Sequence, residues 1–217
     1  MACPTGALGA NHALVHAPLA HWAQVRADVV ALDDGRTTLT YAALHAAVAQ
    51  QAQALHQQQA PNTVFVDDSL TTVQQMVAFL AIITSGRCAA VTDPDWPAAV
   101  RQNVQTAFAQ EASETPVPTP NSPFYIGFTS GSTGSPKGFR RHHQSWTESL
   151  RVCLDTFGAD AAARVLAPGR FSHSLFLFGM MLGLWSGAGV VVQERFSAAR
   201  MLETLQQGHT PCLVAVP

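Results

Sequence analysis

The sequence Thr129-Ser-Gly-Ser-Thr-Gly-Ser-Pro-Lys-Gly138 sets both the fold and the chemistry that we expect of this chain. It directly follows an apolar run, Phe124 to Phe128, that is typical of a buried strand. Its glycines allow positive φ angles and a close approach of the backbone to a ligand. Successive free N–H groups in such a loop favour an anion, and Lys137, the only lysine of the chain, adds a point charge on a flexible stem. The stretch therefore predicts a cradle for a polyphosphate.

The order of residues differs from that of a Walker A loop, in which G-x-x-x-x-G-K-[ST] places its last hydroxyl on Mg²⁺. By composition alone, a solvated Gly/Ser surface loop is the alternative to a phosphate cradle. The candidate phosphate-binding residues come from the loop and its two ends: Thr129, Ser130, Gly131, Ser132, Thr133, Gly134, Lys137 and Gly138.

Residues 125–138 closely resemble the phosphate-loop motif of the adenylate-forming superfamily, which includes acyl- and aryl-CoA synthetases, adenylation domains of peptide synthetases and luciferases. Leu39-Thr-Tyr-Ala-Ala-Leu44 and Asp93-Pro-Asp-Trp-Pro97 resemble two earlier motifs of this superfamily. The segment around Phe171-Ser-His-Ser174 resembles its fourth region, in which P-L-x-H-S precedes a buried helix. The resemblance spans nearly all of the chain.

The resemblance implies a two-step reaction with ATP, Mg²⁺ and CoA. A small carboxylic acid and ATP give an acyl-adenylate and pyrophosphate, and the CoA thiol then displaces AMP. The loop, with Lys137, holds the leaving β,γ-phosphates, and Thr133 is the candidate ligand of Mg²⁺. The chain is therefore interpreted as the N-terminal portion of an AMP-forming acyl- or aryl-CoA ligase. An amino-acid adenylation domain and a non-catalytic nucleotide-binding or interaction module are the alternatives.

The residues before the long apolar segment bear on the substrate. Amino-acid adenylation domains have an F-D-x-S motif whose aspartate neutralises the ammonium group, but Ser172 stands at that position here. The resemblance therefore favours an acid without an α-amino group. His173 occupies the position of a histidine common in CoA ligases, and His143 that of a histidine after the phosphate loop. Both are candidates for the acyl pocket or the nucleotide site, although a hydrogen-bonded structural role at a helix start is the alternative for His173.

Several motifs of the superfamily do not occur in the chain. They are the Y-G-x-T-E motif, the ribose-binding aspartate, the hinge and the C-terminal domain with its catalytic lysine. Lys137 belongs to the phosphate loop and cannot replace that lysine. We expect a fragment that forms no acyl-adenylate on its own, and we assign no catalytic residue within it. An incomplete sheet is expected to expose an apolar face and to favour a homodimer.

The order of the expected elements predicts an α/β fold. A strand at 63–66, a helix ending at Gly86 and a strand at 88–92 predict a parallel pair with a right-handed crossover. We expect a layered α/β/α arrangement with largely parallel sheets built from βαβ units, a truncated N-terminal part of the adenylate-forming enzyme fold. A Pro-rich linker at 111–123 is expected to separate a first α/β region, residues 1–122, from a phosphate-loop region, residues 123–217, that is incomplete at its C-terminus.

Local patterns predict details of the elements. Ser69 and the capping-box order Ser145-Trp-Thr-Glu148 predict helix starts. Trp22 and Val25 are expected on one face of a short helix. The basic run from Arg140 to His143 predicts either extra attraction for phosphate or a solvated turn.

Composition limits the class of protein. Apolar residues make up 47% of the 217 residues and charged residues 12%, which is enough for a sizeable core. A net charge of −2 gives no electrostatic reason to expect nucleic acid or an anionic membrane as partner. Four scattered cysteines and the absence of a signal-peptide pattern favour the cytoplasm. The uncharged segment Leu175 to Val192 is long enough for a membrane span, but Ser186-Gly-Ala-Gly189 interrupts it, so we expect a buried helix and then a strand.

Overall fold

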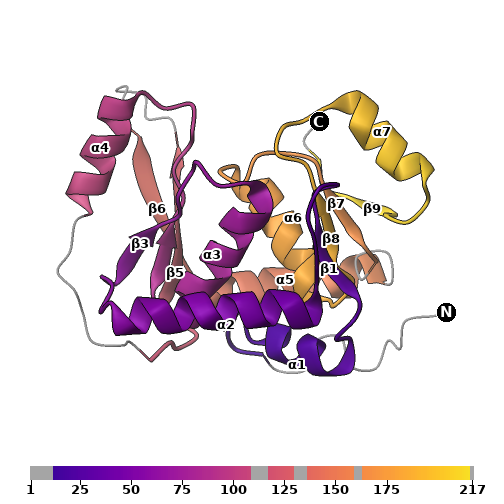
Figure 1. The fold of residues 1–217 in the computed structure, drawn as a ribbon, viewed down its shortest axis with the longest axis horizontal. Helices are drawn as coiled ribbons and strands as arrows, with labels where there is room; N and C mark the ends of the chain where they lie inside the picture. Colours follow the sequence, from indigo (N-terminus) through magenta and orange to yellow (C-terminus); the bar gives the residue numbers. More distant parts are fainter. Residues whose placement is uncertain (1–11, 109–116, 130–135, 159–162, 216–217) are drawn as a thin grey trace.

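The computed structural model describes residues 12–108, 117–129, 136–158 and 163–215, and in these residues it contains two sheets (Figure 1). The five-stranded sheet has the order β2-β1-β8-β7-β9, and the four-stranded sheet has the order β3-β4-β5-β6. The strands of the first sheet are β1 (Val30–Asp33), β2 (Thr38–Thr40), β7 (Val165–Ala167), β8 (Val190–Val192) and β9 (Cys212–Leu213). Those of the second are β3 (Thr63–Phe65), β4 (Cys88–Ala90), β5 (Pro123–Thr129) and β6 (Lys137–His142).

Most neighbouring strands are parallel. The antiparallel pairs are β1 with β2 and β5 with β6, each formed by consecutive strands. All other pairs are parallel, as expected for strands joined by helical crossovers. The predicted α/β class with largely parallel sheets is thus confirmed.

Seven helices lie in the described residues. They are α1 (Pro18–Val25), α2 (Tyr41–Gln57), α3 (Thr72–Thr84), α4 (Ala98–Ala107), α5 (His143–Phe157), α6 (Ser174–Trp185) and α7 (Ala198–Gln206). Figure 1 shows α3 and α6 between the two sheets, while α2 runs across both at their lower ends. The buried side chains of α3 and α6 belong to one hydrophobic core that includes strands of both sheets. The two sheets are therefore parts of one packed unit.

The helix starts follow local capping rules, but not always at the predicted residue. Thr40 caps α2 as expected and accepts a hydrogen bond from Ala43 N at 3.2 Å. The cap of α3 is Thr71, in a reciprocal capping box with Gln74, and not Ser69. Ser69 instead donates its hydroxyl to Asp67 in the preceding turn.

The second half of the chain contains a strand that we did not predict. β6 follows the phosphate loop and pairs with β5 through all its residues, so the basic run lies on a strand rather than in a turn. The next helix consequently begins earlier than its capping-box pattern predicts: α5 starts at His143, and the ring of His142 accepts the hydrogen bond from Ser145 N at 3.2 Å.

The long uncharged segment folds as a buried helix followed by a strand, as predicted. Helix α6 ends at Trp185, and Gly187 and Gly189 then adopt φ angles of +75° and +82° before β8 begins. α6 is apolar around its whole circumference because it is enclosed on all sides. No helix in the described residues has the length and apolar character needed to cross a membrane.

A buried hydrogen-bonded group of three residues joins α2, α6 and the start of β8. The Tyr41 hydroxyl donates to Gly183 O at 3.3 Å and accepts from Gly189 N at 3.1 Å. Burial raises the pKa of this phenol above its ordinary value, so the hydroxyl remains protonated and can donate. Elements that are far apart in sequence are thereby tied together beneath the site described below.

Two other expectations differ from the observed packing. Trp22 is buried and donates to Trp185 O at 3.0 Å, but Val25, predicted on the same face, is 59% exposed. The proposed division at residue 122 does not follow the sheets, because each sheet takes strands from both sides of it. The strand order therefore gives no reason to treat residues 1–122 as a separate packed unit.

Candidate functional site

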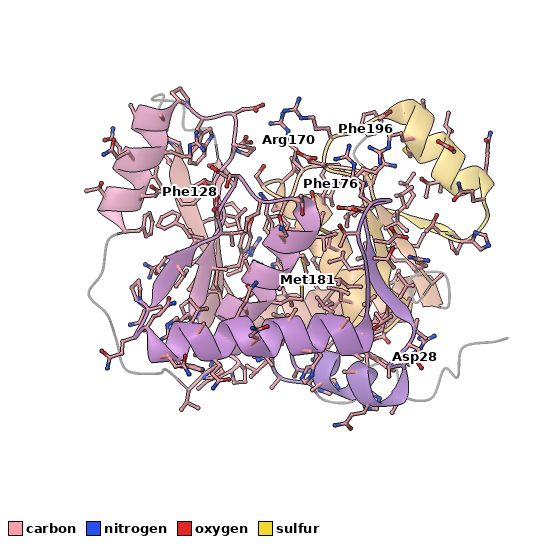
Figure 2. The ribbon with its side chains drawn as sticks, in the orientation of Figure 1. Asp28, Phe128, Arg170, Phe176, Met181 and Phe196 are labelled. Carbon is pink, nitrogen blue, oxygen red and sulfur yellow. The ribbon has the colours of Figure 1, made fainter. Side chains whose placement is uncertain are left out.

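The ends of the parallel strands meet along one edge of the molecule. Loops that follow β3, β4, β7 and β8, together with residues of β5 itself, line two neighbouring cavities at this edge. In open α/β sheets, ligands bind in crevices outside the carboxyl ends of the strands. The same edge carries the residues labelled Phe128, Arg170, Phe176 and Phe196 in Figure 2.

The larger cavity has a volume of about 600 Å³ and lies between the two sheets. Its walls include residues from β5 and β6 on one side and from the start of α6 on the other. Among the lining residues are Asp93, Tyr125, Thr129, Phe139, His173 and Phe176. The volume is in the range of pockets for small organic molecules, and a wall of rings with a few polar groups is typical of such pockets.

Of the phosphate-loop residues that the structure describes, Thr129 lines this cavity. Thr129 ends β5 and Lys137 begins β6, and the two residues are partners across the β5–β6 pair. Both are exposed, and neither forms an ion pair or a side-chain bond to an acid among the described residues. Gly138 is opposite Phe128, and a Cβ at Gly138 would lie 3.2 Å from the Phe128 ring. The remaining predicted phosphate-binding residues lie outside the part of the chain that the structure describes: Ser130, Gly131, Ser132, Thr133, which was also predicted to bind Mg²⁺, and Gly134.

His173 lies at the cavity and occupies the N-cap position of α6. Its ring centroid is 5.3 Å from that of Phe176, which lines the same cavity one turn further along the helix. No side-chain capping bond from His173 to the helix is present, so the ring is not used as a cap. The structure thus brings His173 and Thr129 to the same cavity, and Lys137 is the partner of Thr129 across the β5–β6 pair.

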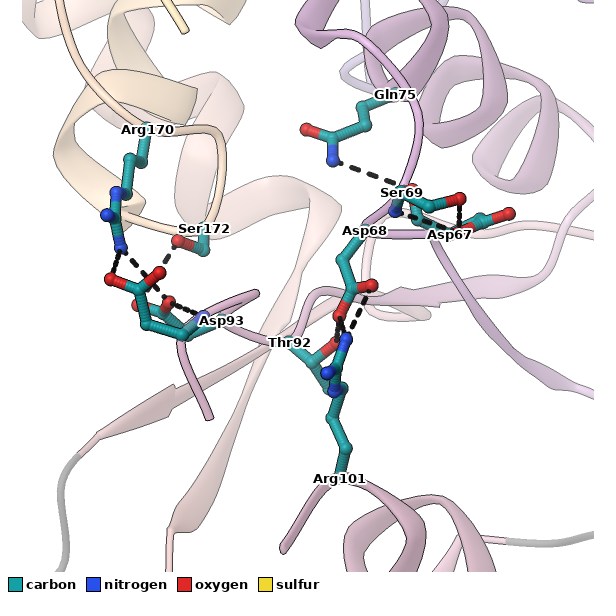
Figure 3. Close-up of polar contacts among 10 residues, drawn as sticks. Asp67, Asp68, Ser69, Gln75, Thr92, Asp93, Arg101, Arg170 and Ser172 are labelled. Carbon is teal, nitrogen blue, oxygen red and sulfur yellow. Dashed lines mark hydrogen bonds and ion pairs between the residues drawn. The ribbon is translucent and has the colours of Figure 1, made fainter. Parts of the chain in front are cut away.

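Ser172 is next to a carboxylate that the sequence did not reveal. Its hydroxyl donates to Asp93 Oδ2 at 3.4 Å, and Arg170 Nη1 lies 3.4 Å from Asp93 Oδ1 (Figure 3). Arg170 also bonds to Asp95, and this hydrogen bond raises the pKa of the guanidinium. These contacts tie the loop after β4 to the loop after β7 across the edge of the cavity.

A second ion pair holds the neighbouring loop. Arg101 Nη1 lies 2.8 Å and 2.7 Å from the two carboxylate oxygens of Asp68, and Thr92 donates to the same carboxylate at 3.3 Å (Figure 3). Arg101 belongs to α4, Asp68 to the loop after β3 and Thr92 to the loop after β4. The sequence motif Asp93-Pro-Asp-Trp-Pro97 contains both aspartates of the first network but did not identify their arginine partner, and no sequence pattern indicated the second network.

His143 is placed in the core and not at the cavity. It is 1% exposed, its Nδ1 accepts from Val15 N at 3.2 Å, and its ring stacks on Phe124 with centroids 4.9 Å apart. Burial is the main cause that lowers its pKa to about 3. The neutral ring therefore anchors the N-terminal segment to β5 and α5.

The buried pair His16 and His143 predicts a loss of stability in mild acid. Their ring centroids are 5.5 Å apart, and burial lowers the pKa of His16 from 6.5 to about 4. Below pH 6.5 the unfolded chain therefore binds protons that the folded chain does not, and stability is lost as pH falls towards these folded values. Between pH 7 and pH 5 we expect the free energy of unfolding to fall by about 2 kcal/mol per histidine, measured by urea denaturation.

The substitution His16→Gln tests the source of this pH dependence. It removes one of the two titrating rings, so the fall between pH 7 and pH 5 should shrink by about half. An equal free energy of unfolding for the unsubstituted chain at the two pH values would show that the histidines are not held neutral.

Comparisons with known proteins identify the class. The profile of the family described as AMP-binding enzyme matches residues 97–217, more than half of the chain. The chain belongs to this family, and its relatives are adenylate-forming ligases. Its fold is that of the N-terminal region of such enzymes.

Two sequence relatives and one solved protein illustrate the match. The uncharacterized acyl-CoA ligase YhfT of Bacillus subtilis is 40% identical over 129 residues, which cover 58% of this chain and 27% of YhfT. Pyochelin synthetase PchE of Pseudomonas aeruginosa is 35% identical over 129 residues, 57% of this chain and 9% of PchE. The o-succinylbenzoate CoA synthetase MenE of Bacillus subtilis, solved with the acyl-adenylate intermediate OSB-AMP, has a TM-score of 0.74 at 18% identity, covering 90% of this chain and 60% of MenE. In complex with ATP and magnesium, MenE has a TM-score of 0.73 at 18% identity, with 90% and 62% covered.

Proposed function

We propose that this chain binds the phosphates of ATP and the carboxylic acid in an AMP-forming acid–thiol ligase. The observation that supports this most directly is that Thr129, the strand partner of Lys137, lines a cavity of about 600 Å³ together with His173. A cation without an acidic partner among the described residues stands beside a space large enough for a small acid. The MenE complexes with ATP and magnesium and with an acyl-adenylate support the same assignment by fold.

In the proposed first step, a carboxylate oxygen of the acid bonds to the α-phosphorus of ATP, and the bond from that phosphorus to the β-phosphate oxygen breaks. Negative charge grows on the departing pyrophosphate, where Lys137 stabilises it more than in the ground state. Mg²⁺ enters bound to the phosphates and shares that charge, as is usual for nucleotide sites. The hydroxyls of Ser130, Ser132 and Thr133, with the loop amides, are proposed to bind the same phosphates, Thr133 also contacting Mg²⁺.

In the proposed second step, the sulfur of CoA attacks the acyl carbon, its proton goes to solvent, and AMP leaves with the bonding electrons. The rings of Tyr125, Phe139 and Phe176 keep water from one side of the acyl group. His173, at the N-cap position of α6, is proposed to position the acid. The match to this chain covers only 27% of YhfT's length. We therefore propose the activity for the protein as its gene encodes it. Residues 1–217 by themselves are expected not to form the adenylate.

A second candidate is the activation of an amino acid. Ser172 cannot neutralise an ammonium group, but Asp93 lies 3.4 Å from its hydroxyl and lines the same cavity. PchE, a peptide synthetase, is among the relatives. Arg170 already balances part of the charge on Asp93 and Asp95, which is why we favour an acid without the ammonium group.

Acid-dependent exchange of pyrophosphate into ATP distinguishes the two candidates. Matched pairs such as 3-phenylpropanoate and phenylalanine differ only in the ammonium group. We expect exchange with the acids that lack the ammonium group, such as 3-phenylpropanoate, followed by CoA-dependent release of AMP. Exchange with the amino acids alone would favour the second candidate, and failure to bind ATP·Mg²⁺ would refute both.

A further inference from the structure

One face of the β5–β6 pair extends from the phosphate loop towards the start of α5. Residues paired across two antiparallel strands share a face, and so do residues two apart on one strand. The three pairs on this face are Thr129 with Lys137, Gly127 with Phe139, and Tyr125 with Arg141. At about 3.4 Å per residue, the Cα atoms of Lys137 and Arg141 are roughly 13 Å apart along the strand. Two cations thus stand at the ends of an aromatic strip.

A smaller cavity of about 310 Å³ lies at the Arg141 end of this strip. The rings that line it come from four elements: Tyr125 of β5, Phe139 of β6, Trp146 of α5 and Phe178 of α6. Tyr125 and Phe139 also line the larger cavity, so these two rings form the wall between the spaces. The only charged side chain among the described residues that line the smaller cavity is Arg141.

The hydroxyl of Tyr125 is buried and has no hydrogen-bond partner among the described residues. An unpaired buried hydroxyl costs about 1–3 kcal/mol, so such a group calls for a partner that the folded chain does not supply. The space for it depends on Gly127, because a Cβ there would lie 2.4 Å from the hydroxyl oxygen. The neighbouring Phe139 ring packs edge-on against the Tyr125 ring, with centroids 5.8 Å apart.

Arg141 is likewise available to bind an anionic group of a ligand. Its guanidinium carbon lies 6.0 Å from the centroid of the Phe139 ring, and none of the ion pairs in the described residues includes it. Its neighbour Arg140 points to the opposite face of β6, because it pairs with Ile126. The two arginines thus have the same charge and strand but face different surroundings.

We infer that the smaller cavity binds an aromatic ring bearing a second anionic group, and that Arg141 and Tyr125 bind this group. The inference rests on the proposed function for one point, that the reacting carboxylate lies in the larger cavity, on the other side of the Tyr125 and Phe139 rings. The aromatic walls select a planar ring, and the single guanidinium selects an anion at its far end. The substrate class is therefore an aromatic acid with a second carboxylate, rather than a plain fatty acid.

Binding of two probes to the chain tests the inference without any turnover. The probes are benzene-1,4-dicarboxylate and 4-methylbenzoate, titrated by calorimetry into the unsubstituted chain and its Arg141→Met, Arg140→Met and Tyr125→Phe variants. Because Arg141 is exposed and screened, we expect Arg141→Met to weaken binding of the dicarboxylate about fivefold. Tyr125→Phe should also weaken it, whereas 4-methylbenzoate should bind both variants like the unsubstituted chain. Arg140→Met should change neither affinity.

Several results would overturn the inference. They are no binding of the dicarboxylate to the unsubstituted chain, equal losses with Arg140→Met and Arg141→Met, and equal losses for the two probes. An unchanged affinity in Tyr125→Phe would remove Tyr125 from the site. Binding of ATP·Mg²⁺, titrated separately, reports on the proposed function, so a failure of one assignment is distinguishable from a failure of the other.

Discussion

Lys137→Ala is expected to slow adenylate formation by about a hundredfold to a thousandfold, the usual effect of removing one charge-stabilising group from a site of developing negative charge. Lys137 is the chain's only lysine and stands where β6 leaves the phosphate loop, opposite Thr129. Because its ammonium group has no acidic partner in the described residues, its substitution should leave the fold unchanged. The measurement is acid-dependent pyrophosphate exchange by the protein as its gene encodes it.

Arg140→Ala is the matched control for this prediction. Arg140 is an exposed cation three residues further along β6, but it faces away from the cavity. The Arg140→Ala substitution should leave the exchange rate nearly unchanged. Lys137→Arg should retain part of the activity, because the positive charge is kept. A rate for Lys137→Ala close to that of the unsubstituted protein would refute the proposed role of this side chain.

Gly189→Ala is expected to lower the free energy of unfolding by about 3–4 kcal/mol, because it combines backbone strain with a collision in the core. Gly189 has a φ angle of +82°, and a Cβ there would lie 2.3 Å from Val30 O. The same residue donates to the Tyr41 hydroxyl and accepts from Val165 N, so a shift of its backbone disturbs β1, β7 and α2 together.

Gly208→Ala separates the two contributions. Gly208 has a similar φ angle, +73°, but nothing lies within 4 Å of a Cβ built on it. Its substitution should therefore lower the free energy of unfolding only by the backbone strain of an alanine at a positive φ angle, about 1 kcal/mol. Urea denaturation of both variants gives the comparison, and equal losses would show that the contact with β1 is unimportant.

Much of the secondary structure was predictable because its causes are local. The cap at Thr40, the turn after Gly86 and the break from Ser186 to Gly189 are each encoded within a few residues. The phosphate-loop motif could equally be recognised from the sequence, since the spacing of its glycines, hydroxyls and lysine is contained in one stretch, and its binding of phosphate stays a prediction. The family assignment followed from that stretch and is confirmed by the profile match to residues 97–217.

The site could be predicted only in part. Strand β6 was not predicted, because a polar, basic run forms a strand only when it can pair with a neighbouring strand, which here is β5. His143 has the sequence position of a site residue, yet the docking of Val15 and Phe124 against it makes it a core residue. The pairing of Arg170 with Asp93 joins residues 77 positions apart, and no local pattern encodes such a distance.

Glycines, hydroxyls and one lysine in a short stretch were thus sufficient to predict the fold family and an anion-binding loop, because both predictions depend on neighbours in sequence. The family is confirmed, and anion binding by the loop stays a prediction. Which arginine faces the smaller cavity and which faces the opposite side of the sheet was decided only by the register of β5 against β6, since a shift by one residue would exchange their faces. The same register leaves the Tyr125 hydroxyl buried without a partner, which is a property of the packed molecule and not of any segment of its sequence.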